Sequence, residues 1–162
     1  MKTDITPFEV AIPASELEDL KQRLARTRWP EKEPCDDWSQ GIPLDYTREL
    51  AHYWATDYDW RRFEKKLNGW PQFMTNIDGI DIHFIHHKSP HKNALPLIIS
   101  HGWPGSIVEF HKIFDALVDP TNHGGNAEDA FHIVAPCLPG YGFSGKPRST
   151  GTSVEKIGRM WG

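Results

Sequence analysis

The stretch LPLIISHGWPG, residues 95–105, decides the fold of this chain of 162 residues. Its first half is a nearly continuous apolar run, which predicts a strand over 97–99 that is buried on both faces, as in a parallel sheet. The run breaks at HGWPG, residues 101–105, and the Ser106-x-x-Glu109 pattern then predicts a capped amphipathic helix. This order puts the turn at the carboxyl end of a strand, where open α/β sheets carry their chemistry. The turn leaves backbone N–H groups free beside a helix start that favours negative charge.

A second turn-rich loop, PGYGFSG at residues 139–145, follows a strand predicted over 131–138. Because the two loops follow neighbouring strands, we expect a site between them. Three glycines of the second loop match the spacing of the dinucleotide fingerprint: Gly140, Gly142 and Gly145. That fingerprint has to open directly into a helix, whereas Pro147 lacks the N–H of a helical residue. We therefore interpret the loop as the border of a pocket and not as a nucleotide site.

The residues before the apolar run predict helices followed by a hairpin. Up to residue 69, three apolar stripes predict three helices, the first capped by Ser15 and Glu18 and the second by Asp45. The stripes are Leu17, Leu20 and Leu24; Leu50, Tyr53 and Trp54; and Trp60, Phe63 and Leu67. Apolar residues then alternate on both sides of Asp78 and Gly79, which predicts a hairpin with a two-residue turn.

This order predicts an α/β fold in two parts. Residues 1–70 form a helical region, and residues 71–162 form a core whose sheet turns from antiparallel to parallel along the chain. A final helix, capped by Thr152 and Glu155, carries three apolar residues on one face: Val154, Ile157 and Trp161. No strand follows this helix, so one edge of the sheet is left unpaired, and we expect the chain to stop inside a fold.

Composition and charge exclude several classes of function. The net charge of −4 argues against a nucleic-acid surface, which would be basic. The N-terminus lacks the apolar segment of a signal peptide, and no apolar run reaches the length of a membrane span. Cys35 and Cys137 lie far apart in the sequence, which fits reduced thiols. A single disulfide between them is the alternative. We therefore expect a cytoplasmic protein without a membrane or nucleic-acid partner.

Two other groups of residues bear on chemistry, and both have a more ordinary explanation. A histidine cluster (His83, His86, His87 and His91) lies near Asp81 in the sequence. Asp81, His83 and His87 share one face of the predicted strand, so a metal site is one interpretation. Solvated histidines on a hairpin are more common, so we expect neither a metal nor a cofactor. No serine lies in a Gly-x-Ser-x-Gly elbow, so none, Ser144 included, is expected to be a nucleophile.

The two turns resemble those of a known family. HGWPG at 101–105 and PGYGFS at 139–144 are similar to motifs of the microsomal-type epoxide hydrolases of the α/β-hydrolase superfamily. The resemblance extends to Phe8-Glu9-Val10, Arg28-Trp29-Pro30, Asn68-Gly69-Trp70-Pro71 and residues 80–86. It covers nearly the whole chain. It implies that residues 1–70 are the N-terminal region of that family and that residues 71–162 are the incomplete first half of an α/β-hydrolase sheet.

The resemblance implies hydrolysis of a small-molecule epoxide to a vicinal diol, without a cofactor. In the family an aspartate forms an ester with an epoxide carbon, two lid tyrosines hold the epoxide oxygen, and a histidine oriented by an acidic residue activates water. Of these roles only the oxyanion hole carries over to this chain. The backbone N–H of Trp103 is one donor, and His101, Gly102 and Pro104 shape a turn in which the Trp103–Pro104 bond is expected to be cis. We also expect Trp103 and Phe143 to contact the substrate.

In the family pattern the nucleophile, lid tyrosines, acid and catalytic histidine all lie beyond Gly162. We therefore expect residues 1–162 alone to be inactive. Two alternatives stay open. One is a non-catalytic fragment or pseudo-enzyme that pairs with another chain, for example as a homodimer, through its open sheet edge. The other is a different α/β-hydrolase, such as an esterase or dehalogenase.

Overall fold

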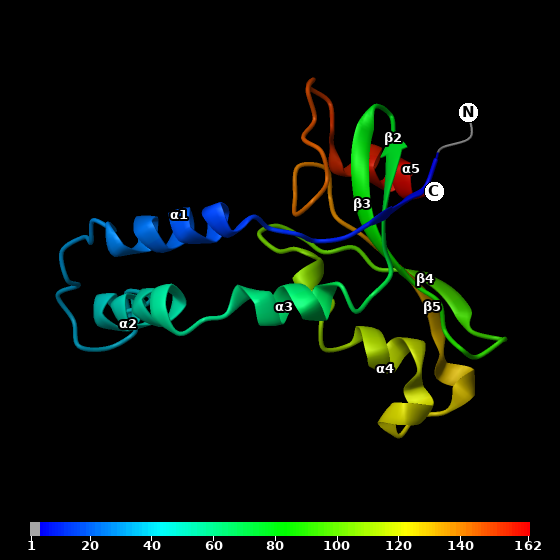
Figure 1. The fold of residues 1–162 in the computed structure, drawn as a ribbon, viewed down its shortest axis with the longest axis horizontal. Helices are drawn as coiled ribbons and strands as arrows, with labels where there is room; N and C mark the ends of the chain where they lie inside the picture. Colours follow the sequence, from blue (N-terminus) through cyan, green and yellow to red (C-terminus); the bar gives the residue numbers. More distant parts are fainter. Residues whose placement is uncertain (1–3) are drawn as a thin grey trace. The chain divides into compact units, whose positions relative to one another are not determined.

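A computed structural model describes residues 4–162, and the contacts within it divide the chain into two units. One unit contains the described residues up to Glu9 together with Asn68–Gly162, and the other contains Val10–Leu67. The first unit holds the whole sheet, and the second holds three helices (Figure 1). The segment before Val10 thus belongs to the sheet unit, although the helical unit separates it in the sequence from the rest of that unit.

The sheet unit contains five strands in the order β1-β2-β3-β5-β4. They are β1 (Thr6–Phe8), β2 (Gln72–Ile77), β3 (Ile80–His87), β4 (Leu95–Ile98) and β5 (Phe131–Pro136). The pairs β1–β2, β2–β3 and β3–β5 are antiparallel, whereas β4 lies parallel to β5. This confirms the predicted α/β core and its change of strand direction. The sequence does not predict β1, because a strand of three residues gives no periodic signal.

The hairpin between β2 and β3 forms as predicted. Asp78 (φ 52°) and Gly79 (φ 81°) both have positive φ, as a type I′ turn requires. Asn76 supports the turn, because its Oδ1 accepts the Gly79 N–H at 3.0 Å and its Nδ2 donates to Asp81 Oδ1 at 2.7 Å. The register set by this turn sends His83 into the interior, where it is fully buried.

β4 is not buried on both faces, which corrects the expectation for residues 97–99. Within residues 4–162 its one neighbour is β5, and Leu95 and Ile98 are 60% and 48% exposed. An apolar run shows that a strand is suited to burial. Whether the strand is buried depends on which elements lie beside it. Pairing with β5 nevertheless continues up to the turn, since the Ile99 N–H donates to the Val134 carbonyl at 3.0 Å.

The helix predicted after the turn is broken into two short pieces, η1 (Ile107–Phe110) and α4 (Phe114–Val118). Ser106 caps η1 as predicted, since its Oγ accepts the Val108 N–H at 3.2 Å. The Glu109 carboxylate lies instead in the space that a Cβ on Gly105 would fill. The glycine therefore makes room for a carboxylate against the turn, and a side chain at this position would displace it.

Two 3₁₀ turns, η2 (Pro120–His123) and η3 (Ala127–Asp129), precede β5, and α5 (Val154–Trp161) follows the sheet. The cap of α5 is Ser153, one residue later than predicted. Met160 is the buried residue of α5 and packs with Ile80 and Ile82. Val154 is 82% exposed, so the predicted apolar face is wrong at this position.

The helical unit contains the three predicted helices, α1 (Ala14–Ala25), α2 (Leu44–Thr56) and α3 (Trp60–Leu67). Both predicted caps are wrong, because α1 and α2 begin directly after Pro13 and Pro43, with no side-chain cap bond. Proline fixes its own φ, so it sets the point at which each extended segment ends. Its side chain has no acceptor that could cap the helix. Glu64 on α3 holds the first segment of the unit, because it accepts the Ile12 N–H at 2.8 Å and the Trp60 Nε1–H at 3.2 Å.

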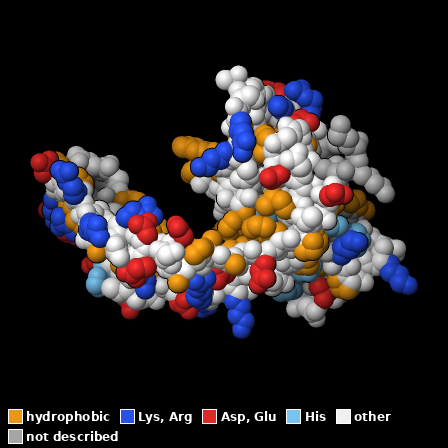
Figure 2. Space-filling view, turned by 45° about the horizontal axis from the view of Figure 1, so that its top comes forward, with side chains coloured by type: hydrophobic (Ala, Val, Ile, Leu, Met, Phe, Trp, Pro, Cys, Tyr) orange, Lys and Arg blue, Asp and Glu red, His pale blue; other side chains and the backbone are white. Residues whose placement is uncertain are grey.

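The surface carries no block of one charge on the face drawn in Figure 2, where basic and acidic side chains are interspersed. In the helical unit the α1 stripe of Leu17, Leu20 and Leu24 is partly buried. The α2 stripe is more open, with Leu50 and Trp54 at 54% and 46% exposure. None of the helices within residues 4–162 combines the length and the apolar character needed to span a membrane.

Candidate active site

The HGWPG turn and the PGYGFSG loop meet at the carboxyl ends of β4 and β5. Because these strands are parallel neighbours, both chain segments leave the sheet at the same edge. His101 joins them directly, since its Nε2 lies 3.1 Å from the Leu138 backbone nitrogen. The His101 ring also meets the Tyr141 ring edge-on, with centroids 5.6 Å apart. The sequence expectation that the two loops lie together is confirmed by these contacts.

The two bonds of His101 fix the tautomer of its ring. A backbone N–H can only donate, so Nε2 accepts from Leu138 and carries no proton. The proton is then on Nδ1, which lies 3.2 Å from the Gly102 carbonyl and donates to it. His101 is only 4% exposed. It therefore ties the first residues of the turn to the end of β5 from inside the molecule.

The turn presents Trp103 at the surface. The Trp103–Pro104 bond is cis, as the resemblance implied, and the Gly105 N–H closes the turn on the Gly102 carbonyl at 2.7 Å. The Trp103 side chain is 81% exposed. Within residues 4–162 no backbone or side-chain acceptor takes the Trp103 N–H. This amide is therefore an unpaired donor of the turn, and within the described residues the N–H groups of His101 and Gly102 have no acceptor either.

The glycines of the second loop are explained by packing. A Cβ on Gly142 (φ 51°) would lie 2.9 Å from Cys137 Sγ, and a Cβ on Gly145 would lie 3.3 Å from the Asp81 backbone. Several N–H groups of the loop are used within the unit, including Gly140 to the Gly145 carbonyl and Gly145 to the Asp81 carbonyl. A phosphate cradle needs such groups to be free. The geometry agrees with the interpretation that this is not a nucleotide site.

Ser144 and Phe143 connect the loop to the sheet. Ser144 is buried, and its Oγ accepts the His83 N–H at 3.1 Å and donates to the Cys137 carbonyl at 2.9 Å. The ring of Phe143 lies 5.4 Å from that of Phe8 and 5.3 Å from that of His83. Ser144 is thus a link between strands and loop. The substrate contact of Phe143 stays a prediction.

The histidines of the predicted cluster go to separate places. His83 is fully buried between Cys137 Sγ (3.2 Å from Nδ1) and Gln72 Oε1 (2.9 Å from Nε2). Burial lowers the pKa of His83 to about 4, so the ring is neutral at physiological pH. Burial also lowers the pKa of His86 and that of His87.

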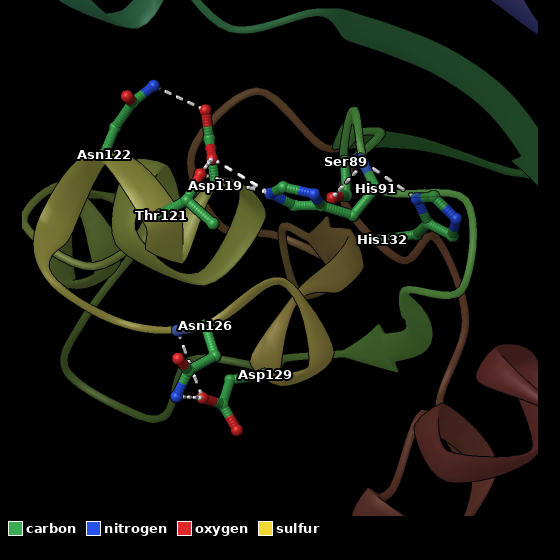
Figure 3. Close-up of polar contacts among 8 residues, drawn as sticks. All are labelled: Ser89, His91, Asp119, Thr121, Asn122, Asn126, Asp129 and His132. Carbon is green, nitrogen blue, oxygen red and sulfur yellow. Dashed lines mark hydrogen bonds and ion pairs between the residues drawn. The ribbon is translucent and has the colours of Figure 1, made fainter.

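The last histidine of the cluster belongs to a polar network at the opposite ends of β4 and β5 (Figure 3). His91 Nε2 lies 3.1 Å from Asp119 Oδ1, to which Thr121 also donates at 2.7 Å. These bonds, that from Thr121 foremost, hold the pKa of Asp119 below its ordinary value. In the part of the chain that the structure describes, no three His, Cys, Asp or Glu side chains are arranged to hold a metal ion.

Comparison with known proteins identifies the family. The family described as "Epoxide hydrolase N terminus" matches residues 5–110. The chain belongs to this family. It is 55% identical over 157 residues to a putative epoxide hydrolase of Stigmatella aurantiaca and 41% identical over 161 residues to epoxide hydrolase 1 of Sus scrofa. Each alignment covers 97% of this chain and 36% of the relative, so the chain spans about a third of the length of these relatives.

Solved structures agree with the sequence relatives. The juvenile hormone epoxide hydrolase of Bombyx mori matches with a TM-score of 0.83 at 30% sequence identity. The match covers 99% of this chain and 38% of the Bombyx mori chain. The Aspergillus niger epoxide hydrolase matches with a TM-score of 0.78 at 36% sequence identity. This match covers 91% of this chain and 38% of the Aspergillus niger chain. The helical unit and the five-stranded sheet thus match the first part of α/β-hydrolase epoxide hydrolases.

Sequence reasoning missed the buried pair of Cys137 and His83. The two residues are 54 positions apart; His83 lies on β3, and Cys137 directly follows β5, which is not the next strand in the chain. They meet because β5 lies beside β3, so that the Cys137 N–H donates to the His83 carbonyl at 2.9 Å. No local motif signals this contact. The one available signal was that Cys137 lies two residues before the loop.

Proposed function

We propose that this chain supplies one half of the oxyanion hole of an epoxide hydrolase that converts a small-molecule epoxide to a vicinal diol. The observation that carries the proposal is the free Trp103 N–H, which lies at the carboxyl edge of β4 on a turn held by His101. Membership of the epoxide hydrolase family supports the reaction class. An N–H fixed in this way stabilises negative charge without having to reorganise during the reaction.

The proposed chemistry proceeds in two steps. A carboxylate of an aspartate attacks an epoxide carbon, the carbon–oxygen bond of the ring breaks, and the released oxygen takes a proton from a tyrosine. Water, deprotonated by a histidine, then attacks the carbonyl carbon of the resulting ester. The Trp103 N–H donates to the carbonyl oxygen as its charge develops. The acyl carbon–oxygen bond breaks, the departing diol oxygen takes the proton from the histidine, and the proton left on the aspartic acid restores the tyrosine. The family pattern places the aspartate, tyrosines and histidine after residue 162, so residues 1–162 alone are proposed to be inactive.

The exposed indole of Trp103 and the ring of Phe143 are proposed to border the substrate. Trp103 is the more accessible of the two, and its side chain is 81% exposed. Replacement of Trp103 by alanine retains the N–H, so it should raise KM more than it lowers kcat. The homodimer and the cytoplasmic location stay predictions from the sequence.

The test is a chimera in which residues 1–162 replace the matching third of the Stigmatella aurantiaca relative, to which they are 55% identical. We expect the chimera to release diol from styrene oxide, and residues 1–162 alone to release none. Turnover by residues 1–162 alone would contradict the assignment of the missing groups. A chimera that hydrolyses p-nitrophenyl acetate but opens no epoxide would assign the turn to an ester hydrolase.

A further inference from the structure

A buried polar cluster lies beneath the two loops and has no part in the proposed chemistry. It consists of Cys137, His83, Ser144 and Gln72. We propose that Cys137 is a positioning residue, whose thiol and backbone together hold the HGWPG turn and the PGYGFSG loop at the distance the oxyanion hole requires. This inference rests on the proposed function. It adds a residue that touches neither the substrate nor the developing oxyanion.

The direction of the bonds in the cluster can be traced from one end to the other. Gln72 Nε2 donates to Asn68 Oδ1 at 3.0 Å, so the amide oxygen of Gln72 is the atom that faces His83. His83 Nε2–H donates to that oxygen at 2.9 Å, which leaves Nδ1 as an acceptor. The Cys137 thiol, 3.2 Å away, donates to Nδ1. The sulfur is therefore held on the side of the sheet where the ring of His83 lies.

The held sulfur fixes the PGYGFSG loop through close packing. Gly142 passes so near Cys137 that a Cβ would lie 2.9 Å from the sulfur. Ser144 returns to the same residue, because its Oγ donates to the Cys137 carbonyl at 2.9 Å. His83 closes the connection from the strand side, since its N–H donates to Ser144 Oγ at 3.1 Å. The loop is thus attached both to the thiol and to the backbone of one residue.

The turn is attached to the same place in the chain. Leu138, the residue after Cys137, donates its N–H to His101 at the start of the turn. The backbone N–H groups of Phe143 and of Ile107, the first residue of η1, partly offset the effect of burial on the pKa of Cys137. Leu138 therefore holds the start of the turn directly, and Cys137 is the residue beside it in the chain. A shift of Cys137 would move both loops.

The thiol is not itself a nucleophile in this arrangement. It is fully buried, and its proton is donated to His83. Burial raises the pKa of Cys137 to about 11, so the reactive thiolate is scarce at neutral pH. A raised pKa suits a cysteine close to a site for electrophilic epoxides, because a protonated thiol does not react with the epoxide. The thiol then acts only by packing and hydrogen bonding.

The test uses Cys137→Ala, Cys137→Ser and the matched control Ile133→Val, which removes one methyl group from a fully buried residue of β5, the strand that ends just before Cys137. In the chimera we expect Cys137→Ala to lower kcat roughly tenfold to hundredfold, with KM within about twofold, because small misplacement of catalytic groups costs rate. Cys137→Ser keeps a donor toward His83 and should restore most of kcat. Ile133→Val should leave both constants near wild type.

Amide hydrogen exchange on the 162-residue chain separates this inference from the proposed function. We expect Cys137→Ala to speed exchange of the Leu138 and Gly145 amides at least about tenfold, the effect of losing roughly 1.4 kcal/mol of local stability. The His86 amide, which donates to the Pro71 carbonyl at 3.0 Å, is the reference and should be unchanged. Uniform acceleration of all amides would overturn the inference, as would unchanged kcat in an active chimera. An inactive wild-type chimera would refute the proposed function, and the exchange result would still decide whether Cys137 holds the loops.

Discussion

At the carboxyl ends of β4 and β5, His101 holds a turn whose Trp103 N–H has no acceptor within residues 4–162. At the amino ends of the same two strands, His91 and Asp119 belong to a network in which side chains bond to one another (Figure 3). Both ends use histidine to fix a loop against the sheet. The difference lies in what the fixed loop leaves unpaired. A rigid turn with an open donor can serve a reaction, whereas a network of paired groups stabilises the fold.

The largest expected effect comes from removing the open donor itself. Replacing Trp103 by its α-hydroxy analogue changes the amide N–H to an ester oxygen and keeps the indole. We expect kcat of the chimera with styrene oxide to fall about 10²–10³-fold, the usual cost of one oxyanion donor. Trp103→Phe retains the N–H and is the matched control, which should keep most of kcat. If both variants had the same kcat, the open donor would have no role and the comparison would fail.

The second effect concerns stability beneath the site and depends on pH. The pKa of His83 is about 4 in the folded chain and near 6.5 when unfolded, so between these values the unfolded state binds more protons. The associated stability is complete above about pH 6.5 and is lost as the pH falls toward 4. The difference of about 2.5 pH units corresponds to roughly 3 kcal/mol in the free energy of unfolding.

Urea unfolding at pH 7 and pH 4.5 measures this loss. We expect His83→Gln to depend less on pH than the wild type, since it cannot be protonated in that range. His86 and His87, whose pKa values burial also lowers, are present in both proteins and cancel in the comparison. Equal pH dependence in the two proteins would mean that His83 is not held neutral by burial.

The sequence predicted the local turns of the site but not the contacts between distant parts of the chain. The HGWPG and PGYGFSG residues predicted the two turns, because turns depend on local residues such as glycine and proline, and the family resemblance predicted the cis bond before Pro104. The contact between His83 and Cys137 could not be predicted, since it depends on β5 lying beside β3. The exposure of Ile98 could not be predicted either, because the neighbours of a strand are not encoded in the strand.

The third effect compares a histidine acceptor at each end. His101 is only 4% exposed, so His101→Phe leaves the Leu138 N–H without its acceptor where water has little access, which should cost about 1–3 kcal/mol in urea unfolding at pH 7. His132→Phe removes the acceptor of the Ser89 N–H, 2.9 Å away, at a partly buried position. Water can replace that acceptor more easily, so we expect a smaller loss. Equal losses would show that the two ends hold their loops equally tightly.

The smallest effect is expected from Asp119→Asn at the amino ends of the strands. Hydrogen bonds from Thr121 and His91 hold the pKa of Asp119 below its ordinary value of 3.8, so its contribution to stability is present above pH 3.8 and lost below it. The His91 and Asp119 side chains are 23% and 27% exposed, and ion pairs in contact with water contribute little. At pH 7 we expect a fall in the thermal midpoint smaller than that of His101→Phe, and diminished further in 1 M NaCl.

The same variant also tests whether the two ends are independent. Asp119→Asn should leave kcat and KM of the chimera at wild-type values, because Asp119 lies in the network at the amino ends of β4 and β5, whereas Trp103 lies at their carboxyl ends. A fall in kcat comparable to that caused by the Trp103 α-hydroxy analogue would show that the network of paired groups also sets the geometry of the open donor. The division between a stabilising end and a reactive end would then have to be abandoned.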